Sequence, residues 1–452
     1  MKKLFVILAL MVSVSLVAQK RDGVKSDIQR NSLCIMMFND GSIDKADVIK
    51  ASFEALPVPD KYNDHNTGKR VWDLADSIKV TEEDYTILNN SRASDATADG
   101  GAKKKSMFGG LMKGLAAGTT GGLVGGGSDK DEVAARALKI MIADNTAKSL
   151  VNRWFLDSTG QHHTADIIMD RGQYALTAEQ LAKAEQESAM SKQEMVTTVA
   201  EGLVKSTFVV FNSFDYLPKE EVLAQIQATM DAAASLGGGY AQLGAKAAGL
   251  ALKASLGDGY FVKITSHLFK LKWTDTLQQE LYEMWDNMEA YNNANYTIEY
   301  IGSDKAFTNT KASIFKSKPE EELIAMATAN AMDQVLAKLE KKYDVFKSKA
   351  PLYIKQGEGP KGKDLYYAEI GMKEGLEKGD KYEVLERVID KATKKEIYKK
   401  VGELKVSDKI WDNRHGAEEE LALKGETQEN KYTVFEGSLK NAYDGLLIRQ
   451  IK

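Results

Sequence analysis

Cysteine and proline are scarce in this sequence. Of its 452 residues, one is cysteine and six are proline. A single cysteine excludes any disulfide within the chain, so export to an oxidising compartment would give it no covalent cross-link. Six prolines argue against Pro-rich linkers. The single cysteine, Cys34, stands in the apolar stretch from Leu33 to Phe38, and we predict a buried strand residue rather than a reactive thiol, because apolar surroundings raise the pKa of a thiol.

Concentrated positive charge is also missing. The formal net charge is -4, and removal of Lys2 and Lys3 would take a mature form to -6. Charges of both signs are interspersed, without long blocks of one sign. Because phosphate binding needs a concentrated basic face, we expect no nucleic-acid partner.

Catalytic spacings are missing as well. The sequence has no H-x-x-x-H or H-x-H pair for a metal, no G-x-S-x-G elbow and no G-x-x-x-x-G-K-[ST] phosphate loop. His162 and His163 stand beside Asp166 and Asp170, but adjacent histidines point apart on a strand, so a polar turn is the favoured interpretation. We therefore predict a protein that is not an enzyme, with no catalytic residue, no metal ligand, no cofactor and no small-molecule ligand identified. A divergent hydrolase with a site outside these motifs is kept as an alternative.

Polar residues after a predicted strand allow two interpretations. The stretch from Thr207 to Phe211 is β-branched and aromatic, which predicts a buried strand. Asn212, Asp215 and Tyr216 then follow, either as a ligand-binding loop or as a turn toward a helix that starts near Pro218. The turn is favoured. His267, within a predicted strand, and His415, in a predicted polar turn, each stand alone.

The first 19 residues have the pattern of a cleaved signal peptide. Lys2 and Lys3 precede an apolar run of about 14 residues from Leu4 to Val17. This run is shorter than the roughly 20 residues that a membrane-spanning helix needs. Cys34 lies too far downstream to be a lipid-anchoring cysteine. We predict an exported protein that is not a lipoprotein, located in the periplasm, with association with the outer membrane as the alternative.

A glycine-rich segment covers residues 106–127. Five of its glycines recur at every fourth position, which on a helix would form one flat stripe for close helix packing or membrane association. Each glycine costs about 1 kcal/mol of helix stability relative to alanine, so a flexible loop is the favoured alternative. The residues of this stripe are Gly110, Gly114, Gly118, Gly122 and Gly126.

Helical and strand patterns predict an α+β fold, with a layered helix and sheet middle domain and a C-terminal small β-barrel of SH3 or OB type. The sequence leaves open whether the N-terminal region folds alone or completes the sheet of the middle domain. The predicted helices are 71–80, 129–155, 177–195, 218–235, 240–256, 276–291 and 319–346. The predicted strands are 33–38, 207–211, 260–273, 295–301, 366–370, 381–387, 395–406 and 446–451. The predicted regions are a signal peptide (1–19), an N-terminal mixed region (20–92), a Gly-rich linker or loop (93–128), the middle domain (129–348) and the barrel (349–452).

The C-terminal stretch from Ile370 to Val384, with the turn Gly379-Asp380, resembles small barrel modules of cell-envelope accessory proteins, including those found beside curli-export and flagellar-assembly components. The wider layout, with Asp344 to Lys347, Lys409 to Arg414 and Gly445 to Gln450, resembles a family of secreted Bacteroidetes-type envelope proteins. The resemblance covers the last two thirds of the chain and implies a cell-envelope location without an activity. The chain departs from the curli-export family in having no lipid-anchoring cysteine.

These patterns together predict an exported, non-catalytic accessory or scaffold protein in envelope assembly or export. Its expected partners are envelope proteins or further copies of itself, with peripheral membrane contact as a further possibility. The alternative is an oligomeric, membrane-active protein that uses the glycine stripe.

Overall fold

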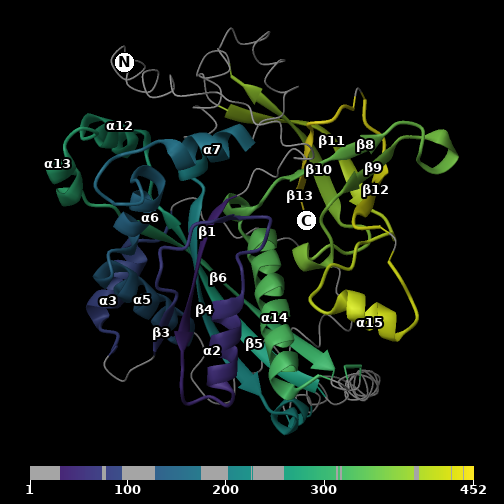
Figure 1. Cartoon of the computed structure of the whole chain (residues 1–452), viewed down its shortest axis with the longest axis horizontal. Coiled ribbons are helices and arrows are strands. Elements are labelled where there is room, and N and C mark those ends of the chain that lie inside the picture. The colour runs from purple at the N-terminus through teal and green to yellow at the C-terminus, as the bar shows by residue number, and fades with distance from the viewer. Residues whose placement is uncertain are drawn as a thin grey trace, which may run out of the picture.

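Two β-sheets organise the chain (Figure 1). The computed structural model describes residues 31–73, 78–93, 128–174, 202–224, 227, 259–311, 314–315, 318–390, 396–428, 430–440 and 442–451. One sheet lies between two layers of helices, and the other is a nearly closed barrel of seven strands. The α+β prediction is therefore confirmed. Over the described ranges, no helix is long and apolar enough to cross a membrane.

The larger sheet is mixed. Its strand order is β2-β1-β4-β5-β6, with β3 also paired to β1. Strands β2, β3 and β4 run parallel to β1, whereas β5 is antiparallel to β4 and to β6. The strands are β1 (Ser32–Asn39), β2 (Asn63–Asp64), β3 (Val71–Asp73), β4 (Thr207–Leu217), β5 (Gly259–Leu271) and β6 (Ile298–Lys311).

Helices cover both faces of this sheet, as Figure 1 shows. The core on one face includes residues of α2 (Ala46–Ala55) and α14 (Glu320–Lys342). The opposite core includes residues of α3 (Glu82–Asn90), α5 (Ser128–Ala143), α6 (Thr146–Phe155), α7 (Asp166–Tyr174), α12 (Asp275–Glu283) and α13 (Met288–Asn293).

Because helices cover both faces of the larger sheet, its strands can be apolar at consecutive positions. In β1, Cys34 and Met36 enter the core with α5 and α6, while Leu33 and Ile35 enter the core with α14, as alternation along a strand requires. The alternation of apolar and polar residues over 260–273 predicts a strand with one buried face. This prediction is wrong for β5, because Leu268 and Phe269 enter the cores on opposite faces of the sheet and are both fully buried.

Strand β1 settles how the N-terminal region folds. Its residues pair in parallel with β4, from Ser32 opposite Thr207 to Phe38 opposite Ser213. The region therefore completes the sheet of the middle domain, and it does so at an inner position of that sheet.

The structure corrects three helix predictions. The predicted helix over 129–155 divides into α5 and α6 at Asn145, whose φ of 50° is left-handed. The predicted helix over 276–291 divides into α12 and α13, where the Asn287 side chain accepts a hydrogen bond from Ala290 N at 3.0 Å. The helix predicted from Val71 is wrong at its start, where β3 pairs with β1. The helix predicted over 319–346 is confirmed as α14, followed by a short 3-10 helix, η1 (Asp344–Phe346). The helices predicted over 177–195 and 240–256, and most of the one predicted over 218–235, lie outside the described residues.

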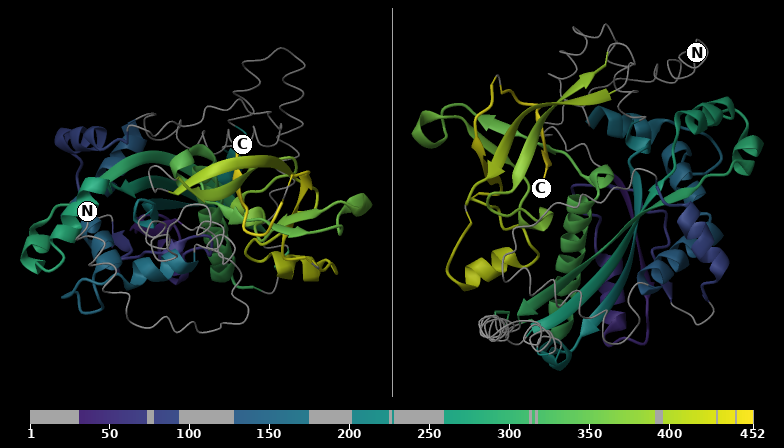
Figure 2. Two further views of the ribbon diagram at one scale, coloured as in Figure 1. Left: turned by 90° about the horizontal axis from the view of Figure 1, so that it is seen from above. Right: turned by 180° about the vertical axis from the view of Figure 1, so that it is seen from behind.

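The barrel sheet has the order β7-β13-β10-β11-β12-β9-β8. Its core includes Val384, Leu404, Phe435 and Ile448. Each of the four predicted C-terminal strands overlaps an observed strand, whereas β7, β8 and β12 were not predicted. Figure 2 shows the barrel beside the larger sheet from two further directions. The barrel elements are β7 (Ala350–Pro351), β8 (Tyr353–Lys355), η2 (Pro360–Gly362), β9 (Leu365–Ala368), η3 (Met372–Glu374), β10 (Lys381–Ile389), β11 (Glu396–Val406), α15 (Ala417–Leu423), β12 (Thr433–Gly437) and β13 (Leu447–Gln450).

Candidate functional site

The histidine pair occupies a turn before α7. His163 stacks on Trp285 with ring centres 5.0 Å apart, and its Nδ1 lies 2.7 Å from the Trp285 carbonyl oxygen. Burial lowers the pKa of His163. His162, Asp166 and Asp170 are exposed. Among the residues that the structure describes, no three His, Cys, Asp or Glu side chains are grouped to hold a metal ion.

Asn212 and its neighbours continue β4, so both interpretations of them as a loop or turn are wrong. Asn212 is fully buried; its Nδ2 donates to the Met36 carbonyl at 2.8 Å, and its Oδ1 accepts from Ser266 Oγ at 2.5 Å. Asp215 forms an ion pair with Lys263 at 2.8 Å. These residues fix the packing of neighbouring strands.

The remaining single candidates are structural too. Cys34 is fully buried, and burial raises the pKa of its thiol to about 12, as predicted. His267 is buried in β5, with Nδ1 3.4 Å from Tyr300 Oη. His415 Nε2 lies 3.1 Å from Oδ2 of Asp333, a residue of α14. The glycine stripe from Gly110 to Gly126 lies outside the described residues.

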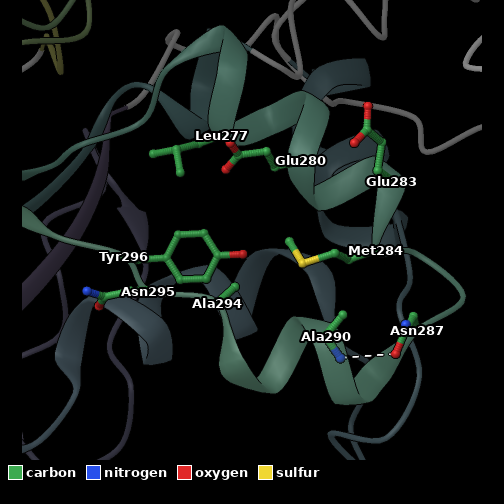
Figure 3. Close-up of a pocket in the computed structure, with 9 residues that line it drawn as sticks. All are labelled: Leu277, Glu280, Glu283, Met284, Asn287, Ala290, Ala294, Asn295 and Tyr296. Atoms are coloured by element: carbon green, nitrogen blue, oxygen red, sulfur yellow. Dashed lines mark hydrogen bonds between the residues drawn. The ribbon is translucent and has the colours of Figure 1, made fainter.

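A pocket of about 370 Å³ lies between α12 and α13 (Figure 3). This volume is at the lower end of the range for small-molecule sites. The walls combine apolar side chains with two glutamates. The lining residues are Leu277, Glu280, Glu283, Met284, Asn287, Ala290, Ala294, Asn295 and Tyr296.

Tyr296 supplies the most unusual group in this pocket. Its side chain is 5 % exposed, and its hydroxyl has no hydrogen-bond partner within the described part of the chain. Burial, together with a smaller contribution from the nearby Glu280 carboxylate, raises the pKa of Tyr296 to about 12. The hydroxyl therefore remains protonated at neutral pH.

Behind Tyr296 lies a lysine among aromatic rings. Lys148 Nζ lies 3.5 Å from the centre of the Tyr291 ring and 5.1 Å from that of Tyr296. Tyr291 in turn contacts His163, with ring centres 4.5 Å apart. Burial lowers the pKa of Lys148 to about 8.

Sequence reasoning missed the pocket, although the sequence carries a signal for it. From Trp273 to Asp304 there are seven acidic residues and no Lys, Arg or His. The prediction that charges of both signs are interspersed along the chain is therefore wrong for this acidic stretch, which includes α12, α13 and the start of β6. The buried hydroxyl of Tyr296, by contrast, depends on packing that no local pattern predicts.

A second notable region joins the two sheets. Asn330 of α14 exchanges two hydrogen bonds with the backbone of His415, at 3.2 Å and 3.1 Å. Lys341, about three turns further along α14, donates to the Gly375 carbonyl at 2.6 Å and lies 3.4 Å from Asp380. Helix α14 thus contacts the sheet with one side and the barrel with another.

Comparisons with protein-family models, with curated proteins and with solved structures give no significant match to this chain.

Proposed function

We propose that this chain is an exported, non-catalytic accessory protein of the cell envelope, which acts in assembly or export as a scaffold. The export signal in residues 1–19 and the resemblance of the segment 370–384 to envelope barrel modules support the location. The observation that carries the scaffold role is the junction formed by α14, which holds the barrel against the larger sheet.

Contacts at this junction are polar and specific. His415 is anchored through its backbone by Asn330, and its ring lies against the buried Asp333. On the barrel side, Glu374 accepts from Gly371 N at 2.6 Å and from Asn413 Nδ2 at 2.9 Å. Removing one side chain of a buried hydrogen-bonded pair leaves the other without a partner, at a cost of about 1 to 3 kcal/mol. Such contacts favour one relative orientation, so that two binding surfaces are held at a fixed distance.

The barrel is part of the same proposal as an SH3- or OB-like module. Short antiparallel strands joined by glycine-containing turns support this type. Two of these turn glycines are Gly375 and Gly379, with φ of 71° and 88°. The partners we propose are envelope proteins or further copies of the chain, with peripheral membrane contact and no nucleic acid.

Fractionation of the native host tests the location. We expect the chain in the periplasm or in the outer-membrane fraction, with residues 1–19 removed. Recovery from the cytoplasm with an intact N-terminus would contradict export. Retention through a carbonate wash, lost when Gly114, Gly118 and Gly122 are replaced by leucine, would instead favour the membrane-active alternative.

Junction variants test the scaffold role. The double variant Asn330→Ala, Lys341→Met removes contacts between α14 and the barrel while leaving both cores intact. Lys338→Met is the matched control, because Lys338 is exposed on the same helix and bonds the Lys305 carbonyl of the larger sheet. In a host without the native gene, we expect the double variant to restore envelope integrity less well than the control. Equal restoration by both would contradict a role for fixed domain geometry.

A further inference from the structure

The Tyr296 hydroxyl is a buried polar group whose partner is not supplied by the described part of the chain. Buried hydroxyls are nearly always hydrogen-bonded, because an unsatisfied one costs about 1 to 3 kcal/mol. Figure 3 shows this hydroxyl directed into the space between α12 and α13, facing Met284 and lying below Glu280. The pocket therefore presents a group that a bound molecule can satisfy.

Charge at the pocket is negative. Glu280 and Glu283 both line it and are both exposed. Glu283 accepts a hydrogen bond from the neutral side chain of Gln279 at 3.0 Å, which leaves its charge uncompensated by that contact. Because α12 and α13 carry no basic residue, the field at the mouth of the pocket attracts cations.

Apolar walls limit which cation fits. Leu277, Met284, Ala290 and Ala294 surround the space in front of the tyrosine. Asn287 uses its side-chain oxygen to cap α13, so this oxygen is already engaged. A ligand that satisfies both parts of the pocket has a short hydrocarbon body and one cationic, hydrogen-bond-donating end.

We propose that the pocket between α12 and α13 binds an alkylammonium group, with the ammonium donating to Tyr296 Oη and the Glu280 carboxylate. The alkyl chain packs against Met284 and Leu277. This site goes beyond the scaffold role, since it requires neither the α14 junction nor a location in the envelope.

Lys148 is a cation close to the pocket and must be included in the argument. Its ammonium donates to the Tyr291 carbonyl and lies over the Tyr291 ring, at 3.5 Å from the ring centre. Its 5.1 Å approach to Tyr296 is to the ring. Lys148 therefore leaves the carboxylates of Glu280 and Glu283 to a ligand.

Two sources provide the same ammonium chemistry: a free small amine, or the lysine side chain of a partner protein. Calorimetric titration of the purified chain from residue 20 onward separates them at pH 7, where alkylamines are charged. The probes are butylamine, 1,5-diaminopentane and the peptide acetyl-Gly-Lys-Gly-amide, with 1-butanol and butyrate as neutral and anionic comparators. Binding of the peptide and of the amines indicates a lysine side chain, whereas binding of the amines alone indicates a free amine.

Variants locate the binding. We expect Glu280→Gln to weaken butylamine binding at least tenfold, because it removes the charge-assisted contact, and Tyr296→Phe to weaken it about threefold. Glu289→Gln is the matched control, since it removes an equal charge from an exposed residue of α13 outside the pocket lining. It should change the affinity less than twofold. Glu280 is exposed, so its replacement tests the site even where Tyr296→Phe impairs folding.

Three results would overturn the proposal. The first is the absence of a saturable binding signal for all three ammonium probes. The second is binding of 1-butanol as tightly as butylamine, which would make the pocket merely apolar. The third is an equal loss in Glu289→Gln and Glu280→Gln, which would reduce the effect to the overall charge of the helix pair.

Discussion

Lys148 Nζ lies 3.5 Å from the centre of the Tyr291 ring and donates a hydrogen bond to the carbonyl oxygen of the same residue. The lysine side chain is 8 % exposed. Burial lowers the pKa of its ammonium from 10.5 to about 8, because the charged form loses hydration. The charge of Lys148 therefore opposes folding at neutral pH.

This relationship predicts how stability depends on pH. Between about pH 8 and 10.5 the unfolded chain holds the Lys148 proton more tightly than the folded chain does, so this residue's contribution to stability rises with pH in that window. Below pH 8 its cost is fully present. We expect Lys148→Met to raise the free energy of unfolding at pH 7 by roughly 1 to 2 kcal/mol, with the advantage falling as the pH approaches 10. Urea unfolding from pH 7 to 10 measures it.

A control isolates the effect of Lys148 from other lysines. Lys349 also has its pKa lowered to about 8 by burial, so the quantity compared is the difference between the native chain and each variant. Lys272→Met, at an exposed position, should give a flat difference across the same range. A flat difference for Lys148→Met would contradict the prediction.

Cys34 provides a probe of global unfolding. It is fully buried in β1, with its thiol pKa raised to about 12. Because the thiolate is the reactive form, we expect a thiol-reactive dye at pH 8 to modify the native chain only as fast as the sheet opens. Full reaction within minutes in guanidinium would provide the positive control. Equally rapid reaction without denaturant would show that β1 is accessible in the native state.

Much of the fold could be predicted from local pattern. Strand β4 follows from its β-branched and aromatic residues. Helix α14 follows from its long run of regularly spaced apolar residues and from Pro319 at its N-terminus. Asn145 breaks the predicted helix over 129–155 through a left-handed conformation, and nothing in the local apolar pattern requires this break. The role of Asn212 could not be predicted, because its partners Met36 and Ser266 are 176 and 54 residues away.

The candidate pocket was predictable only in its charge. Counting acidic residues from Trp273 onward would have marked α12 and α13 as a cation-attracting surface. The volume between the helices depends on how Asn287 ends one helix pattern and begins the next. The position of the Tyr296 hydroxyl in the pocket depends on how this residue packs in the tertiary structure.

Gly302 is required by its close approach to Tyr343. A Cβ atom at residue 302 would lie 2.1 Å from Tyr343 Oη, and the backbone φ there is +154°. The same hydroxyl accepts a hydrogen bond from Ser303 N at 2.9 Å, which fixes its position. We expect Gly302→Ala to lower the free energy of unfolding by about 3 kcal/mol, since the clash occurs in a packed core.

Gly357 is the matched control for that substitution. Its φ is +71°, but a Cβ atom there would meet nothing within 4 Å. Gly357→Ala should therefore cost about 1 kcal/mol, from backbone strain alone. Thermal or urea unfolding of both variants gives the comparison, and equal losses would show that the contact with Tyr343 is not the cause.

Asn212 and Ser266 form a buried polar pair between β4 and β5, and this pair predicts a non-additive response to mutation. Ser266 Oγ donates to Asn212 Oδ1, so Asn212→Ala leaves a buried hydroxyl without that acceptor and should cost about 3 kcal/mol. Ser266→Ala removes the donor and should cost about 1 kcal/mol. In the double variant neither half of the pair is left unsatisfied, so its loss should be smaller than the sum by about 1 kcal/mol in a double-mutant cycle. Strict additivity would mean that the two side chains contribute independently, and that Asn212 is held mainly by its bond to the Met36 carbonyl of β1.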